Sequence, residues 1–141
     1  MTAMVSVHLS KLDGPALHWV VAQIEGLEVE LVPPHYMTGW KLMLPCGAAY
    51  RPTEDWVQGG ALLDKYCKSF GMVSGNVPDK FRAFAIKPEP PGFCRIAGGD
   101  SIRIALCRAL ARLYRLSDHD DHVLVPQVLA PVDAGVPVNA A

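Results

Sequence analysis

The chain has 141 residues, 50% of them hydrophobic, and a formal net charge of −1, which indicates a single domain with its own core. The near-neutral charge gives no overall field favouring duplex nucleic acid or an acidic membrane. No stretch approaches the roughly 20 uninterrupted apolar residues of a membrane-spanning helix, and no signal peptide is recognisable. Four widely spaced cysteines without a CxxC pair fit a reducing cytosol, so we expect a cytoplasmic protein.

The first elements are a short strand and a helix with clear end signals. Residues 5–9 alternate apolar and polar side chains, which predicts a strand. Asp13 is an expected N-cap, Pro15 suits the first helical turn and Gly26 supplies a left-handed stop. The sequence therefore predicts a helix between Asp13 and Gly26. His18, next to Trp19 on this helix, is expected at its surface or boundary.

Three further strands are predicted by alternation, at residues 27–32, 40–44 and 80–86. The proline-rich residues 87–92 are expected to form an exposed loop. Residues 130–141 lack periodicity, and we expect an extended or mobile tail. Residues 1–129 would then form one domain.

The strongest helical pattern follows a double glycine, with Asp100 as the expected N-cap. Its apolar residues recur at steps of four and three, which predicts a packed face: Ile102, Leu106, Ala109, Leu113 and Leu116. This heptad-like run is also compatible with a homodimer interface. Another face carries Arg108, Arg112 and Arg115, either as a solvated surface or as a site for phosphate or an acidic partner.

These elements predict an α+β fold. We expect a single compact domain in which two main helices and a short helix pack on a small, mostly antiparallel sheet of three to five strands. The short helix is predicted after the double glycine of the segment "TEDWVQGG", residues 53–60.

That segment has two interpretations. Thr53 is a candidate cap for a short turn, and Gly59 and Gly60 would precede the first turn of the next helix. Free amides at such a helix start are a natural anion site. Alternatively, the two glycines break the chain at a structural elbow, and Trp56 fills the core beneath it.

As a ligand site, the segment offers complementary chemistry for a nucleotide. Trp56 would stack on a base, Gln58 would read the base edge, and Arg51 would pair with a phosphate. Thr53, Gly59 and Gly60 complete this candidate set.

The chain shows no Ser/His/Asp set, HExxH, GxSxG, P-loop or GxGxxG motif, so we expect neither a catalytic function nor a cofactor. Residues 118–122, "DHDDH", contain metal-ligand side chains, but adjacent loop residues rarely converge on one ion, and we expect no metal. Cys67 and Cys107 are expected to be small core residues.

Three blocks carry a family resemblance. "PTEDWVQGGALLDK" resembles the P-S-T-D-W-x-Q-G-G-P-I-I-E segment of the phage NinX-like family of small uncharacterised proteins. "LDGPALHWVVAQIEG" is similar to that family's L-T-G-x-A-L-D-W-A-V-A-x-x-E-G opening, and the helix from residue 98 with the later "VLVP" resembles its closing segments. The blocks occur in order over most of residues 11–129. His18 and Ala61 depart from the family pattern, which has an acidic residue and a proline there.

The resemblance implies a phage or prophage origin and a role in the infected bacterial cell. We therefore expect a non-catalytic accessory protein that sequesters a small anionic, nucleotide-type ligand, with counter-defence as one purpose. The alternative is a protein-interaction module that inhibits a host protein. A third hypothesis is an enzyme acting on nucleotides through Asp55 or His119.

Overall fold

The structure is a computed structural model that describes residues 3–35, 39–73, 79–87, 94–114, 121–130 and 135–137. Within these residues the chain forms three α-helices, with two short 3-10 turns at Leu9–Lys11 and Gln127–Leu129. The helices are α1 (Gly14–Glu25), α2 (Trp56–Tyr66) and α3 (Ile102–Tyr114). None of the helices in the described ranges is long and apolar enough to cross a membrane.

The strands form three small antiparallel sheets. In the first sheet, β1 (Met4–His8) lies between β7 (His122–Pro126) and β8 (Gly135–Pro137). In the second, β2 (Glu30–Val32) pairs with β3 (Lys41–Met43). In the third, β5 (Phe81–Ile86) lies between β4 (Cys67–Met72) and β6 (Cys94–Gly99). The predicted α+β class with antiparallel strands is confirmed, and the structure adds that the strands are divided among three sheets.

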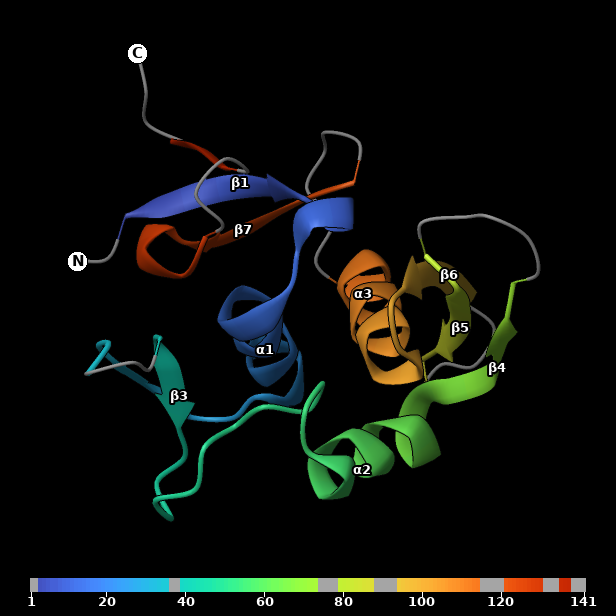
Figure 1. Ribbon diagram of the computed structural model, residues 1–141, viewed down its shortest axis with the longest axis horizontal. Coiled ribbons are helices and arrows are strands. Elements are labelled where there is room, and N and C mark those ends of the chain that lie inside the picture. The colour runs from blue at the N-terminus through green and yellow to red at the C-terminus, as the bar shows by residue number, and fades with distance from the viewer. Residues whose placement is uncertain are drawn as a thin grey trace.

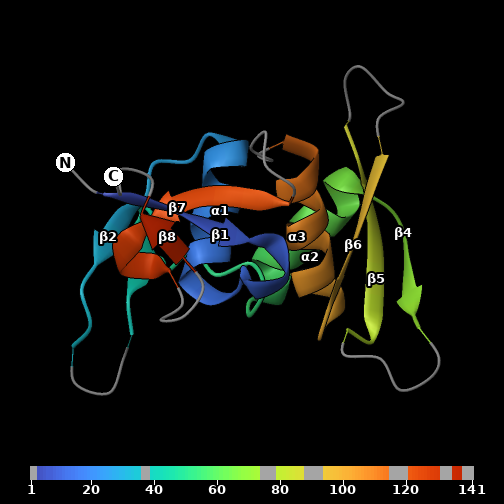
Figure 2. The same cartoon turned by 90° about the horizontal axis from the view of Figure 1, so that it is seen from above.

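Helix α3 lies at the centre of the fold, between α1 and one face of the β4–β5–β6 sheet (Figures 1 and 2). Ala83 and Ala85 of β5 are fully buried on that face, and their small side chains allow the helix to approach the sheet closely. Gly99 makes the contact tighter still, because a Cβ there would meet the main-chain nitrogen of Ala105 at 2.8 Å.

The centre of the apolar face of α3 is internal, so Leu106 and Ala109 do not supply the dimer interface considered above. Leu106 and Ala109 are 1% and 0% exposed within the single chain, because α1 and the sheet cover them. A dimer stays a prediction without an assigned surface. The helix is also capped differently from expectation: Ser101 rather than Asp100 accepts from the Ile104 amide (3.1 Å), because α3 begins at Ile102 and Ser101 is the residue directly before it.

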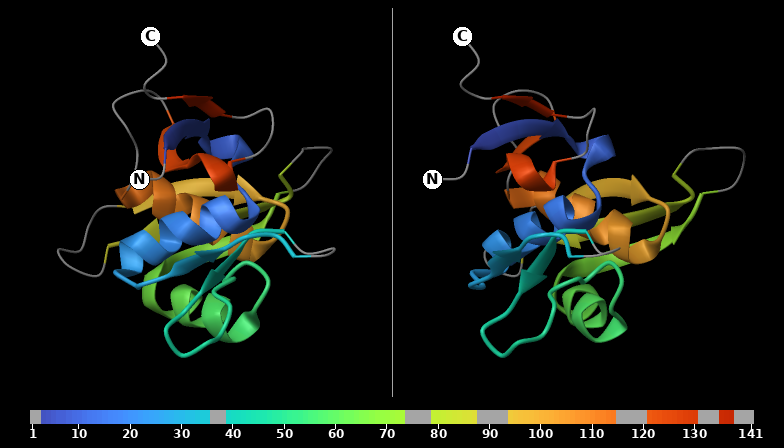
Figure 3. Two further views of the ribbon diagram at one scale, coloured as in Figure 1. Left: turned by 90° about the vertical axis from the view of Figure 1, so that its left-hand side faces the viewer. Right: turned by 60° about the vertical axis from the view of Figure 1, so that its left-hand side comes forward.

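Helix α1 confirms its predicted ends. The Asp13 carboxylate accepts from the Gly14 amide (2.8 Å), Pro15 lies in the first turn, and Gly26 has a φ of 68°. The helix packs against β3 on one side and β7 and α3 on the others (Figure 3). This surrounding contact explains why the helix is buried over most of its circumference, beyond the single stripe that the sequence predicts.

The other predicted strands are present with shifted ends. Residues 5–9, 40–44 and 80–86 correspond to β1, β3 and β5, whereas only Glu30–Val32 of residues 27–32 is a strand. Part of the expected tail, Gly135–Pro137, pairs with β1. Most of the proline-rich loop at 87–92 lies outside the described residues.

Candidate functional site

The double glycine lies inside helix α2 rather than before a helix. Asp55 is the N-cap, and its carboxylate accepts from the amides of Val57 (2.8 Å) and Gln58 (3.2 Å). The Gly59 amide donates to the Asp55 carbonyl (2.8 Å) as part of the first helical turn. The predicted anion site at Gly59 and Gly60 is therefore wrong, because helix formation already uses these amides. Thr53 is not the cap either, since Asp55 takes that position.

The two glycines have different reasons to be small. A Cβ at Gly59 would collide with the Pro52 carbonyl oxygen and meet the Arg103 Cδ at 2.7 Å. A Cβ at Gly60 would meet nothing within 4 Å. Gly59 is thus required by close packing of α2 against its neighbours, while the packing does not require Gly60.

Trp56 faces solvent instead of the core. Its side chain is 62% exposed, and the Arg103 guanidinium stacks on its ring with the Cζ atom 4.1 Å from the ring centroid. The interpretation of Trp56 as the filling of a structural elbow is wrong, because α2 starts at this residue and directs it outward.

Gln58 is a clamp on the preceding segment rather than a reader of a base. Its Oε1 accepts from the Arg51 amide (2.7 Å), and its Nε2 donates to the Ala49 carbonyl (2.8 Å). Both ends of the side-chain amide are therefore engaged by main-chain groups nine and seven residues earlier. The role predicted for Gln58 is wrong, but the side chain fixes the position of Arg51.

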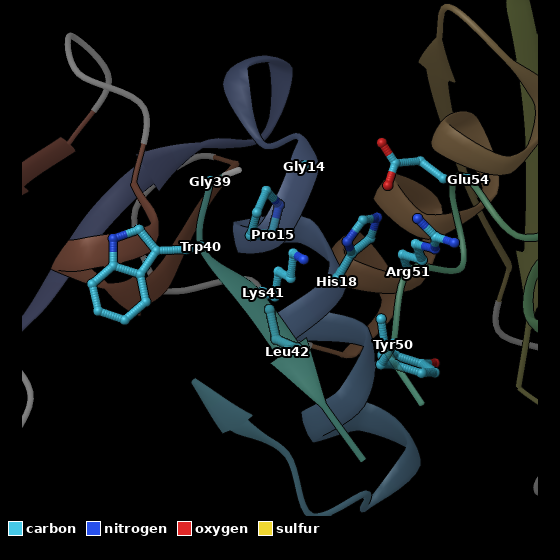
Figure 4. A pocket seen from close by; sticks show the side chains of 11 residues that line it. Gly14, Pro15, His18, Gly39, Trp40, Lys41, Leu42, Tyr50, Arg51 and Glu54 are labelled. Carbon is cyan, nitrogen blue, oxygen red and sulfur yellow. The ribbon is translucent and has the colours of Figure 1, made fainter. Parts of the chain in front are cut away.

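A cavity of about 480 Å³ lies next to this clamped segment (Figure 4). Its walls come from three parts of the chain: the first turns of α1 (Gly14, Pro15, His18), residues 39–42 around β3, and residues 49–51 with Glu54. The volume falls in the range of about 300–1,000 Å³ that is typical of small-molecule sites. In Figure 4 the Trp40 ring points away from His18 and Arg51, so it forms an outer margin rather than a stacking platform.

The cavity is lined by charged side chains of both signs. Lys41, Arg51 and Glu54 are exposed, and within the described part of the chain none of the three forms a side-chain hydrogen bond or ion pair. Arg51 and Glu54 come from the same turn, and Lys41 comes from the opposite wall (Figure 4). These groups are therefore available to a ligand with complementary charge.

His18 lies between those walls and is buried, with 4% exposure. Its Nε2 forms a 2.6 Å hydrogen bond with the Thr53 hydroxyl, which joins α1 to the clamped segment. Burial lowers the pKa of His18 to about 4, against the raising effect of Asp13 and with a further lowering by Arg51. His18 is therefore neutral at pH 7. The predicted surface or boundary position of His18 is wrong, because a second segment covers that face of the helix.

The arginines of α3 support the fold. Arg108 is 7% exposed, and its guanidinium donates to the carbonyls of Leu12 (2.9 Å) and Gly98 (3.1 Å). Arg112 donates to the Ile96 carbonyl and to the Asp121 carboxylate (3.1 Å). The expected exposed arginine face is thus wrong for Arg108, and main-chain carbonyls take the acceptor role proposed for a phosphate. Arg115 lies outside the described residues.

Only part of the predicted site meets at the cavity. Arg51 lines it, Thr53 anchors its wall and Gln58 holds that wall in place, whereas Trp56, Gly59 and Gly60 are not among its lining residues. Lys41, Glu54 and His18 were not predicted. No local pattern marks them, because they are brought together by contacts between segments far apart in the sequence.

Of the "DHDDH" segment, residues 118–120 lie outside the described residues, and Asp121 pairs with Arg112. In the part of the chain that is described, no group of three or more His, Cys, Asp or Glu side chains is placed to hold a metal ion. Cys107 is buried as predicted, while Cys67 is half-buried.

Compared with known proteins, the chain matches no protein-family model and no curated sequence.

Proposed function

We propose that this chain is a non-catalytic accessory protein that sequesters a small anionic, nucleotide-type ligand in the cavity between α1, β3 and residues 49–54. One observation carries the proposal: two cations from different walls, Lys41 and Arg51, line a cavity of about 480 Å³ without partners among the described residues. Charge-assisted hydrogen bonds from such groups are the strong contacts in anion recognition.

The biological setting of the proposal comes from the sequence resemblance. A NinX-like phage protein would act in the cytoplasm of the infected bacterium, where capture of a nucleotide signal would serve counter-defence. Sequestration requires affinity and no chemical step.

The test is calorimetric titration of the purified full chain with adenosine and guanosine monophosphates. Lys41→Ala and Arg51→Ala should each weaken binding about 10–100-fold, because each removes a charge-assisted hydrogen bond. Lys68→Ala is the matched control, since Lys68 is an exposed cation on β4 that does not line the cavity. Equal binding by all variants would overturn the proposed site.

The fate of the ligand separates sequestration from catalysis. After incubation and heat denaturation, chromatography of the supernatant should return the intact nucleotide. A converted nucleotide would instead support an enzyme, and His18 with Thr53 would be the first pair to mutate, because the 2.6 Å contact is compatible with a base and a hydroxyl nucleophile.

A protein-interaction module is the second candidate, favoured by the exposed start of α2. Trp56 is 62% exposed, with the Arg103 guanidinium on its ring, and the neighbouring Val57 is 84% exposed. Trp and Arg are both enriched among the residues that carry most of the binding energy of protein interfaces. Under this alternative, Trp56→Ala should abolish the effect that the protein has on phage growth in infected cells. If the protein instead sequesters a nucleotide, Trp56→Ala should leave both nucleotide binding and the effect on phage growth unchanged.

A further inference from the structure

We propose that the cavity recognises a guanine nucleotide, with Arg51 and Glu54 reading the base and Lys41 contacting the phosphate. The inference rests on the proposed function and names the chemical class of its ligand. It starts from a carboxylate, Glu54, that has no ion-pair partner among the described residues and lies in a cavity whose other charged side chains are cations.

Arg51 and Glu54 are presented by one tight turn. The amides of Glu54 and Asp55 both donate to the Arg51 carbonyl, each at 2.9 Å. Between the two charged residues, Pro52 and Thr53 are buried, so the turn is anchored at its centre and its charged ends project outward. Figure 4 shows both side chains at the same end of the cavity.

The two side chains do not neutralise each other. Arg51 and Glu54 form no ion pair, although they are three residues apart on an exposed turn. A ligand for this end of the cavity must therefore offer acceptors to the guanidinium and donors to the carboxylate. A plain anion such as inorganic phosphate would satisfy Arg51 and leave Glu54 opposed to it.

Guanine has this combination on adjacent edges. Its O6 and N7 atoms are an acceptor pair that a guanidinium fork matches. Its N1–H and exocyclic N2 amine are neighbouring donors, and an ionised carboxylate accepts two such bonds at once. Adenine has an amine donor next to N7 and no paired donors on its other edge. Hypoxanthine has the O6 and N7 acceptors but lacks the N2 amine.

Hydrogen bonds hold the turn that carries Arg51 and Glu54 in place before any ligand binds. Gln58 clamps the Arg51 and Ala49 main chain, and Thr53 is bonded to His18. Binding of a ligand then costs little conformational entropy in this part of the cavity wall. A wall with a fixed shape favours discrimination between similar bases. Lys41, on the other wall, is a mobile point charge suited to a phosphate rather than to a planar base edge.

The experiment compares guanosine, inosine and adenosine monophosphates by calorimetric titration of the full chain. Guanosine monophosphate should bind at least about 10-fold more tightly than inosine monophosphate, because loss of the N2 amine leaves a carboxylate oxygen without its donor. Glu54→Gln should remove this difference. Glu28→Gln is the matched control, since Glu28 is exposed and does not line this cavity. Melting curves confirm that both variants fold.

The outcomes separate the inference from the function on which it rests. Equal affinities for the three nucleotides, a preference for adenosine monophosphate, or an unchanged preference in Glu54→Gln would overturn guanine recognition and leave nucleotide sequestration standing. Absence of binding by all three nucleotides at millimolar concentration would overturn both. A guanine preference that only Glu54→Gln removes is the expected result.

Discussion

Two neighbouring regions use their polar side chains in opposite ways. At the start of α2 the polar groups are satisfied within the chain: Asp55 caps the helix, and Gln58 bonds two main-chain groups. In the cavity wall directly before it, Arg51 and Glu54 have no such partners among the described residues. The helical part of the segment at residues 53–60 is thus structural support, whereas the turn that carries Arg51 and Glu54 directly before the helix offers side chains available to a ligand.

The largest effect should come from comparing two arginines. Arg108→Met should lower the free energy of unfolding by about 3 kcal/mol, because the carbonyls of Leu12 and Gly98 lose their buried donors. Arg51→Met should leave the melting temperature unchanged and reduce nucleotide binding. Urea unfolding and calorimetric titration of both variants measure the two properties. Equal stability of the two variants would contradict the division between support and site.

The second effect is a loss of stability at low pH, caused by protonation of His18, which joins α1 to residues 49–54 through Thr53. The folded-state pKa of about 4 lies below the ordinary value of 6.5, so the unfolded chain takes up a proton first as the pH falls. Stability should therefore be intact above about pH 6.5 and fall by up to about 3 kcal/mol on acidification to pH 4. Urea unfolding of the wild type and of His18→Gln between pH 8 and pH 4.5 tests this, and the variant should lose most of the slope.

The third effect distinguishes the two glycines of α2. Gly59→Ala should destabilise the protein by about 1–3 kcal/mol, because the methyl group collides with the Pro52 carbonyl and with Arg103. Gly60→Ala should stabilise it by about 1 kcal/mol, since the position is helical and the space around it is open. Opposite signs in thermal unfolding are expected, and a shared sign would refute the packing explanation.

The smallest effect tests whether the support acts on the site. Gln58→Leu should cost about 1–2 kcal/mol through the two lost hydrogen bonds. It should also weaken binding of guanosine monophosphate several-fold without touching the ligand. Gln127→Leu, at an exposed position on the 3-10 turn, is the matched control. Loss of stability with unchanged affinity would show that the clamp does not position Arg51.

The sequence predicted the fold class well, and it predicted the site only partly. Residues whose role depends on near neighbours were predictable, such as the Asp13 cap and the Gly26 stop. Strands β4 and β6 were not predicted, because "CKSFGM" and "CRIAGG" lack clean alternation and gain their form from pairing with β5. Of the three charged residues that line the cavity, Arg51 is among the residues that the sequence predicts for a ligand site, whereas Lys41 and Glu54 are not.

By itself, the sequence determined the α+β class, the ends of α1 and the helical character of α3, because these depend on periodicity and on groups a few residues apart. Only the tertiary structure decided which polar side chains form hydrogen bonds within the protein. Thr53 reaches His18 across 35 positions, and Arg108 reaches Leu12 across 96. A hydrogen bond between residues so far apart in the sequence leaves no local pattern. The packing of α1, α3 and residues 49–54 therefore determines which polar side chains support the fold and which remain available to a ligand.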